Sequence, residues 1–229
     1  MFENPLIQRR NRANSRDMRF LITAGPTREA IDPVRYLSNH SSGKMGVALA
    51  AAAVGSGHEA VLIAGPVCLP APEGVERVDI VSAEEMYAAV ETRIDGVDAA
   101  IFCAAVADYR PVDPVDQKIK KSDERMTIEL ERTRDILGSA RDTFHFDGLL
   151  VGFAAETENV RENALSKLER KGCDFLVAND VSDPSIGFGS DDNAVTVYSA
   201  DGREFPLGRR SKADLASQLI DLFVSGPAK

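Results

Sequence analysis

The sequence of 229 residues contains no tryptophan, three histidines and three cysteines, and these shortages exclude several kinds of site. Cys68, Cys103 and Cys173 are far apart and form no Cys-x-x-Cys pair, which favours a reducing cytoplasm. The histidines are too dispersed for a metal triad, and no His-Glu-x-x-His motif occurs. We therefore expect a cytoplasmic protein without a structural metal.

An excess of positive charge and long apolar runs are also absent. The net charge is −9, whereas non-specific nucleic-acid binding needs a basic surface, so we expect no nucleic-acid partner. The arginines within residues 1–17 precede no apolar stretch long enough for a signal peptide or a membrane span. We interpret residues 1–17 as a polar leader or linker remnant and residues 18–229 as one domain.

Short apolar runs alternate with helical patterns from Met18 onward. This alternation predicts an α/β fold with a Rossmann-like, mostly parallel sheet and helices on both faces, in three layers. Predicted strands cover 19–23, 60–64, 77–81, 99–104, 149–154 and 175–178, and predicted helices cover 43–55, 83–93, 136–142, 159–171 and 212–224. Residues 193–206 predict an antiparallel hairpin at one sheet edge, turning at Asp201-Gly202. The charged segment 111–133 is interpreted as a lysine-bearing flap outside the main fold.

Polar loops follow four of the predicted strands, at residues 25–39, 105–111, 155–157 and 179–180. Because doubly wound sheets bind ligands beyond the carboxyl ends of their strands, we expect these loops to converge on one site. The first loop leads into a helix N-terminus, an arrangement that binds phosphate or carboxylate groups. Ser41-Ser42-Gly43 is also typical of an ordinary helix cap, and Asn39 beside it favours a ligand site.

Several other residues allow two interpretations. The run at Lys118–Lys121 is either a solvated surface or part of a flap that closes over a triphosphate. Lys167 and Lys171 lie at the margin of an apolar helical stripe, so they either extend to solvent or lean toward the protein body. Phe153 is expected in the core on composition alone.

Familiar nucleotide-binding motifs are missing. No Gly-x-Gly-x-x-Gly follows a strand, Ser42-Gly43-Lys44 lacks the upstream glycine of a P-loop, and no Tyr-x-x-x-Lys occurs. These gaps disfavour a nicotinamide-dependent reductase, which stays as the alternative enzyme, beside a non-catalytic nucleotide-sensing module.

Six motifs, in order along the chain, resemble the phosphopantothenate-cysteine ligase family, also called phosphopantothenoylcysteine synthetase. They are Ile-Thr-Ala-Gly-Pro-Thr-Arg-Glu, Asp-Pro-Val-Arg-Tyr-Leu-Ser-Asn-His-Ser-Ser-Gly-Lys-Met-Gly, Ala-Ala-Val-Ala-Asp-Tyr-Arg-Pro, Lys-Ile-Lys-Lys, Gly-Phe-Ala-Ala-Glu-Thr and Ala-Asn-Asp-Val. This family forms the C-terminal half of the bacterial bifunctional coenzyme A biosynthesis flavoprotein, and the resemblance spans residues 18–224.

The resemblance implies a ligase that joins 4'-phosphopantothenate to L-cysteine with CTP, through an acyl-cytidylate, releasing pyrophosphate and CMP. It also implies nucleotide-bound Mg²⁺, whose protein ligands it does not assign, and a homodimer. No part of the sequence resembles the flavin-binding decarboxylase half, so we expect no flavin in this chain and expect a separate phosphopantothenoylcysteine decarboxylase as a partner. The chain is then either a stand-alone ligase or an excised domain.

The resemblance assigns residue roles as well. Asn39 would bind the acyl-cytidylate and Lys118 would neutralise the phosphates, and both are the expected catalytic residues. The implied nucleotide-binding residues are Cys103, Ala104, Ala105, Asp108, Lys118, Arg134, Asp135, Ile136, Leu137, Phe153, Lys167 and Lys171. The implied residues for the substrate or intermediate are Asn39, Ser41, Ser42, Gly43, Lys44 and Asn179. Family members often have Asn-Pro-Asp where this chain has Thr133-Arg134-Asp135.

Overall fold

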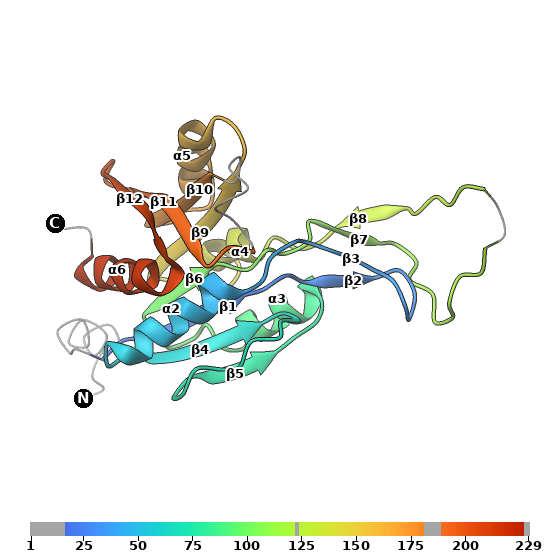
Figure 1. Ribbon diagram of the computed structural model, residues 1–229, viewed down its shortest axis with the longest axis horizontal. Helices are drawn as coiled ribbons and strands as arrows, with labels where there is room; N and C mark the ends of the chain where they lie inside the picture. Colours follow the sequence, from blue (N-terminus) through green and yellow to red (C-terminus); the bar gives the residue numbers. More distant parts are fainter. Residues whose placement is uncertain (1–16, 122–123, 181–188, 227–229) are drawn as a thin grey trace, which may run out of the picture.

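The computed structural model describes residues 17–121, 124–180 and 189–226, so the predicted leader lies outside it apart from Asp17. Its centre is an eight-stranded sheet in the order β12-β11-β10-β9-β6-β1-β4-β5 (Figure 1). Six neighbouring strands run parallel: β1 (Arg19–Ala24), β4 (Glu59–Ala64), β5 (Glu76–Asp79), β6 (Ala99–Phe102), β9 (Leu149–Glu156) and β10 (Phe175–Asp180). The inner strands are continuous apolar runs, as burial on both faces requires. The predicted parallel sheet is confirmed.

The predicted hairpin forms one edge of the sheet. β11 (Asp192–Ser199) pairs antiparallel with β10, and β12 (Glu204–Ser211) pairs antiparallel with β11. Gly202 in the turn has φ +86°, a conformation that glycine adopts without strain. The hairpin prediction is therefore confirmed, with both strands reaching further than the sequence suggested.

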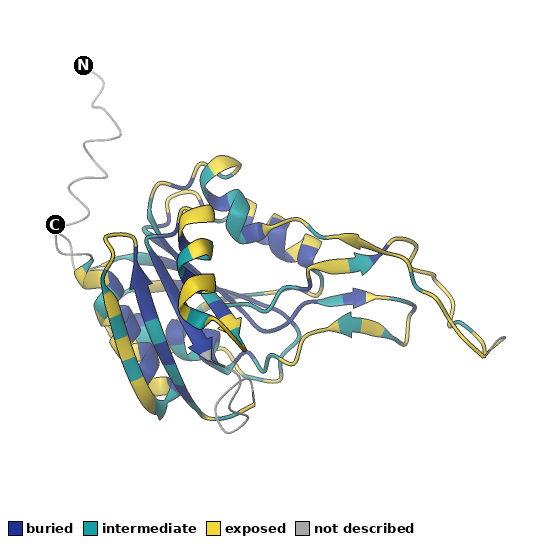
Figure 2. Ribbon diagram, turned by 90° about the horizontal axis from the view of Figure 1, so that it is seen from above, coloured by how far each residue is buried: buried dark blue, intermediate teal, exposed yellow. Residues whose placement is uncertain are grey.

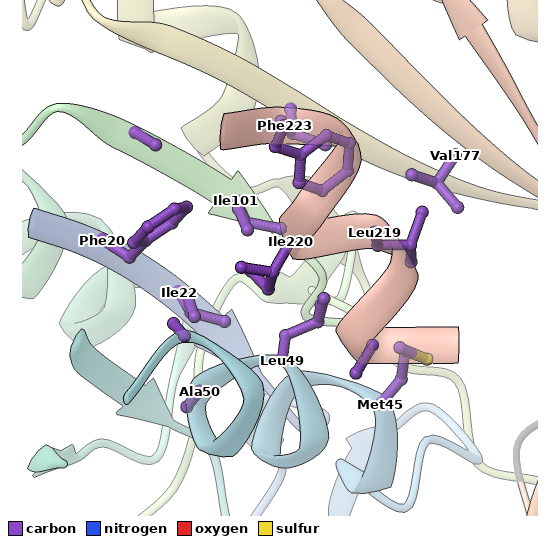
Figure 3. Packing of buried hydrophobic residues seen from close by; sticks show 14 of the residues in the cluster. Phe20, Ile22, Met45, Leu49, Ala50, Ile101, Val177, Leu219, Ile220 and Phe223 are labelled. Carbon is purple, nitrogen blue, oxygen red and sulfur yellow. The ribbon is translucent and has the colours of Figure 1, made fainter. Parts of the chain in front are cut away.

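Five helices among the described residues cover the two faces of the sheet. α2 (Lys44–Gly55) and α6 (Lys212–Ser225) pack on one face, and α3 (Ala83–Glu91), α4 (Ile136–Asp142) and α5 (Val160–Arg170) pack on the other. Figure 3 shows Leu49 and Ile220 packed over Ile22 and Ile101 of the central strands. Full burial of such a side chain stabilises the fold by about 1.5–3 kcal/mol. None of the described helices is both long and apolar enough to cross a membrane.

Two short ribbons extend from the body as an arm, defined here as residues 28–38 and 109–132 (Figure 1). β2 (Arg28–Ala30) pairs with β3 (Tyr36–Ser38), and β7 (Tyr109–Pro111) pairs with β8 (Leu130–Arg132). Exposed residues dominate the arm, in contrast to the body (Figure 2). The predicted excursion at 111–133 is confirmed, whereas the contribution of residues 28–38 was not predicted.

Candidate active site

A pocket of about 780 Å³ lies beyond the carboxyl ends of β1, β6, β9 and β10. It spans the boundary between β1 and β6, where the strand order reverses, the position at which open α/β sheets bind ligands. Every residue expected at the site except Lys118 lines this pocket: Asn39, Ser41, Ser42, Gly43, Lys44, Cys103, Ala104, Ala105, Asp108, Arg134, Asp135, Ile136, Leu137, Phe153, Lys167, Lys171 and Asn179.

The first turn of α2 lines one wall of the pocket. Its N-cap residue is Gly43, with φ +74°, so no side chain of the cap residue accepts from the first-turn amides. A Cβ at Gly43 would lie 2.8 Å from Val67 Cγ1 and 3.3 Å from Gly25 Cα. Glycine is therefore required here for both conformation and space. Because unsatisfied first-turn amides attract anions, this wall of the pocket is suited to a phosphate or carboxylate.

Two buried threonines hold the loop that follows β6. Thr23 Oγ1 accepts a hydrogen bond from Ala104 N at 3.2 Å, and Thr27 Oγ1 accepts one from Ala107 N at 2.9 Å. Both threonines are at most 1% exposed. The sequence argument missed them as positioning residues, although Thr23, near the end of a buried apolar strand, needs a hydrogen-bond partner.

Asn39 connects two of the converging loops. Its Nδ2 donates to Ala105 O at 2.9 Å and to Val106 O at 3.2 Å. The side chain itself is exposed in the pocket wall. Asn39 thereby fixes the loop after β3 against the loop after β6.

Lys167 and Lys171 lean into the pocket from α5, which settles the choice between the two predicted orientations. Lys167 Nζ donates to Phe153 O at 2.9 Å, and burial lowers the pKa of this lysine. Lys171 forms an ion pair with Asp135, which also caps α4 by accepting from Gly138 N at 2.8 Å. Burial raises the pKa of Asp135, but the hydrogen bonds from Lys171 and Gly138 outweigh it, so the net shift is downward.

A second pair of lysines lies on the opposite face of the sheet. Lys44 Nζ contacts Asp191 Oδ1 at 2.6 Å, and this hydrogen bond lowers the pKa of Asp191. Lys212 Nζ donates to Ser190 O at 2.6 Å, and burial lowers the pKa of Lys212. Lys212 was missed by the sequence argument. The sequence did contain a signal: Lys212 precedes Leu215 and Ala216 of α6 by three and four residues, so it lies on the same buried face of the helix.

Two asparagines close the pocket between the lysine pairs. Asn179 is 9% exposed, and its Oδ1 has no hydrogen-bond partner among the residues that the structure describes. Asn193 on β11 is 4% exposed and lines the same pocket. A buried amide oxygen without a partner requires a hydrogen-bond donor, which a ligand in the pocket would supply.

Comparison with known proteins places this site in a family. Residues 15–225 match the model of the DNA/pantothenate metabolism flavoprotein C-terminal domain. The chain belongs to this family. Coenzyme A biosynthesis bifunctional protein CoaBC of Vibrio vulnificus is 50% identical over 206 residues, which cover 89% of this chain and 51% of that protein. The Escherichia coli protein of the same name is 47% identical over 207 residues, which cover 89% and 50%. The chain thus spans about half the length of these relatives.

Solved structures agree with this assignment. The crystal structure of the C-terminal domain of CoaBC has a TM-score of 0.78 and 43% identity, covering 91% of this chain and 94% of that chain. A Cab2 mutant in complex with phosphopantothenate-cysteine has a TM-score of 0.73, covers 96% and 89%, and is 14% identical, so it supports the fold alone. The Rossmann-like prediction and the family resemblance are both confirmed.

Arg134, which directly precedes the N-cap residue of α4, is held at the rim of the pocket. Its guanidinium pairs with Glu84 on α3, with Nε 3.1 Å from Oε2, and this hydrogen bond raises the pKa of Arg134. The same group lies 3.6 Å from the centroid of the Tyr87 ring. Arg134 therefore links α3 to the start of α4 and presents less of its charge to the pocket than a lone arginine would.

Cys103 lies at the pocket as an inert thiol. Burial raises its pKa to about 12, so the thiolate that nucleophilic catalysis needs is scarce at neutral pH. Across the described part of the chain, no three His, Cys, Asp or Glu side chains gather to hold a metal ion.

Lys118 is exposed on the arm and does not line the pocket of the same chain. Of the residues expected at the site, it is therefore the one that the fold does not bring together with the others.

Proposed function

We propose that this chain is a phosphopantothenate-cysteine ligase. It joins 4'-phosphopantothenate to L-cysteine, with CTP activating the carboxylate. The family match and the coenzyme A biosynthesis relatives support the proposal, and a protein of the same fold, the Cab2 mutant, is in complex with phosphopantothenate-cysteine.

The observation that carries the proposal is the arrangement of cationic groups in one pocket. Lys44 and Lys212 lie on the α2 and α6 side, and Lys167 and Lys171 lie on the α5 side. This arrangement supports two anionic ligands in the pocket: the phosphate of phosphopantothenate would lie at the start of α2, and the nucleotide triphosphate would lie near α5. The loop fixed by Asn39 lies between them, where the two reacting groups would meet.

The reaction then follows from positioning and charge stabilisation. The substrate carboxylate attacks the α-phosphorus of CTP, and the bond to the β-phosphate oxygen breaks, giving acyl-cytidylate and pyrophosphate. The cysteine amine attacks the acyl carbon, loses a proton and displaces CMP. Asn39 holds the intermediate and Lys118 neutralises phosphate charge in the first step. No enzyme nucleophile is required, which suits the protonated Cys103.

Magnesium is part of the proposal as a companion of the nucleotide. Mg²⁺ takes much of its octahedral shell from phosphate oxygens and water, so it needs no cluster of three protein ligands. Asp108 is an exposed carboxylate in the pocket wall that would hold one of its waters, whereas Asp135 in the same wall is paired with Lys171. When bound, the ion would neutralise charge on the leaving pyrophosphate.

We propose that the arm joins two copies of the chain into a homodimer. Large apolar side chains are exposed along it: Val34, Tyr36, Tyr109, Val112, Val115, Met126 and Leu130. A second copy would cover this surface and would bring the arm of one subunit, with Lys118, near the pocket of the other. Sedimentation velocity tests this point, since Tyr36→Asp and Leu130→Asp should each shift the protein toward monomer and lower activity. Monomeric wild-type protein with full activity would contradict it.

The assay for the activity measures pyrophosphate release with 4'-phosphopantothenate, in the presence and absence of cysteine. CTP should support release and ATP should do so poorly. Lys118→Gln should greatly slow the first step while leaving a measurable rate, and Asn39→Asp should let the acyl-cytidylate accumulate. Pyrophosphate release at the wild-type rate by both variants would refute the roles, and tight NADPH binding without an effect of CTP would support the reductase instead.

A further inference from the structure

Asp32 is a fully buried carboxylate in an arm that is otherwise mostly exposed. It lies in the turn between β2 and β3. Its Oδ1 accepts from Val34 N at 2.9 Å and from Arg35 N at 2.8 Å, and its Oδ2 accepts from Arg35 Nε at 3.0 Å. Hydrogen-bond donors within the turn therefore satisfy both oxygens of the buried Asp32 carboxylate without any contact to the rest of the arm.

The same carboxylate also reaches the other ribbon of the arm. Ile119 N donates to Asp32 Oδ2 at 3.1 Å, and Arg35 Nη2 donates to Ile119 O at 3.1 Å. The ion pair thus holds both polar backbone groups of one residue. That residue follows Lys118, and its N–H belongs to the peptide bond that joins the two.

Few other contacts of this kind hold the segment 113–121 within the described structure. Val115 N donates to Ile31 O at 3.2 Å, again to the turn that contains Asp32. Residues 113–121 form no helix or strand, and only Ile119 among them is partly buried. The backbone position of Lys118 therefore depends on the Asp32–Arg35 pair.

We propose that Asp32 is a positioning residue for Lys118, holding the Lys118–Ile119 peptide so that the ammonium is presented to the phosphates. The inference rests on the proposed ligase function, because it assigns Asp32 a role in cytidylate formation. The Arg35 guanidinium holds the pKa of Asp32 well below its usual range, against the effect of burial, so the carboxylate stays ionised at neutral pH.

The kinetic test is a double-mutant cycle with pyrophosphate release as the readout. Asp32→Ala should lower kcat on the order of ten- to a hundredfold, the usual effect of displacing a reacting group by about 1 Å, with the KM for 4'-phosphopantothenate unchanged. In the Lys118→Gln background the same change should have no further effect, because the group that Asp32 positions is gone. Glu131→Gln is the matched control, since it removes the exposed Arg110–Glu131 pair of the arm and should leave kcat at the wild-type value.

A second readout does not depend on activity. Amide hydrogen exchange in peptides covering 113–121 should become faster in Asp32→Ala and stay unchanged in Glu131→Gln. If Asp32→Ala fails to fold by circular dichroism, Asp32→Asn keeps the side-chain volume and an acceptor, and it should show a smaller effect of the same sign in both measurements.

The two proposals fail in different ways. Additive losses in the cycle, or wild-type exchange and kcat in Asp32→Ala, would overturn the positioning role while leaving the ligase activity intact. Absence of CTP-dependent pyrophosphate release in the wild-type protein would overturn the function. Faster exchange in Asp32→Ala would then show only that Asp32 holds the backbone of residues 113–121.

Discussion

Replacing Gly46 by alanine tests how closely α2 must pack against β1. Gly46 lies in the first turn of α2, buried against β1. A Cβ there would lie 2.5 Å from Ala24 Cβ, 3.0 Å from Ala24 Cα and 3.1 Å from Thr23 O. Carbon atoms pack at about 3.5–4.0 Å, so α2 must move away from β1 by about 1 Å.

The magnitude follows from two opposing effects. Overpacking costs about 1–3 kcal/mol, and its upper range applies because the obstructing atoms belong to a central strand and cannot rotate away. Alanine returns about 1 kcal/mol through its higher helix propensity. We therefore expect Gly46→Ala to lower the free energy of unfolding by about 1–2 kcal/mol, and the melting temperature by about 2–4 °C per kcal/mol.

Gly55 offers a matched control at the other end of the same helix. It is exposed, and a Cβ there meets no atom within 4 Å. Gly55→Ala should therefore raise the free energy of unfolding by about 0.5–1 kcal/mol. The change from glycine to alanine is thus expected to lower the free energy of unfolding at Gly46 and to raise it at Gly55.

Urea denaturation followed by circular dichroism measures the stability, and pyrophosphate release measures the site. Displacement of the first turn moves Gly43 and Lys44, so the KM for 4'-phosphopantothenate should rise in Gly46→Ala and stay constant in Gly55→Ala. Equal shifts of both variants in the same direction, or a normal KM with a destabilised Gly46→Ala, would show that the packing of α2 on β1 does not set the site.

Three further predictions concern individual charges and thiols. Because burial lowers the pKa of Lys167, its ammonium is lost at a lower pH than in a free lysine. The KM for CTP should therefore rise with pH already below the ordinary lysine value of 10.5, and Lys167→Met should abolish that dependence. The pKa of Asp135 is lowered on folding, so its stabilising contribution is complete above its ordinary value of 3.8 and is lost as pH falls through the folded value. As pH falls below 3.8, the free energy of unfolding of Asp135→Asn should consequently decrease less than that of the wild type, as measured by urea denaturation. Iodoacetamide at mildly alkaline pH should label the exposed Cys68 before Cys103 and Cys173, whose pKa values burial raises to about 12 and about 11; mass spectrometry of the peptides gives the order.

The parallel sheet could be predicted because each of its strands is encoded by a short stretch of neighbouring residues. A strand such as β1 is a short apolar run, and the alternation with helical patterns selects a parallel sheet with crossover helices. Once that topology is fixed, polar residues after different strands must meet at one edge. Asn39, Phe153 and Asn179 were brought together in this way, from positions far apart in the sequence.

The arm could be predicted only in part, because its strands carry little local information. β2, β3, β7 and β8 have three residues each, and only β8 follows an alternation of apolar and polar side chains, at residues 126–131. They are held by contacts between distant segments, of which the Asp32–Ile119 hydrogen bond is the example. Periodicity does not encode such contacts, so the burial of Asp32 could not be read from the sequence.

The lysines of the pocket explain how a chain with a net negative charge could bind a negatively charged nucleotide. A net charge of −9 repels a triphosphate at long range, yet at physiological salt charges beyond about 8 Å are largely screened. At the site, Lys44 and Lys171 are paired with Asp191 and Asp135, so two lysines approach the pocket without raising its field before a ligand arrives. Under the proposed function, a phosphate group would replace each carboxylate as the partner of an ammonium that is already in position. The aspartates would then keep the lysines ordered before the ligand binds, so that folding and not substrate binding would meet the entropic cost of ordering these long side chains.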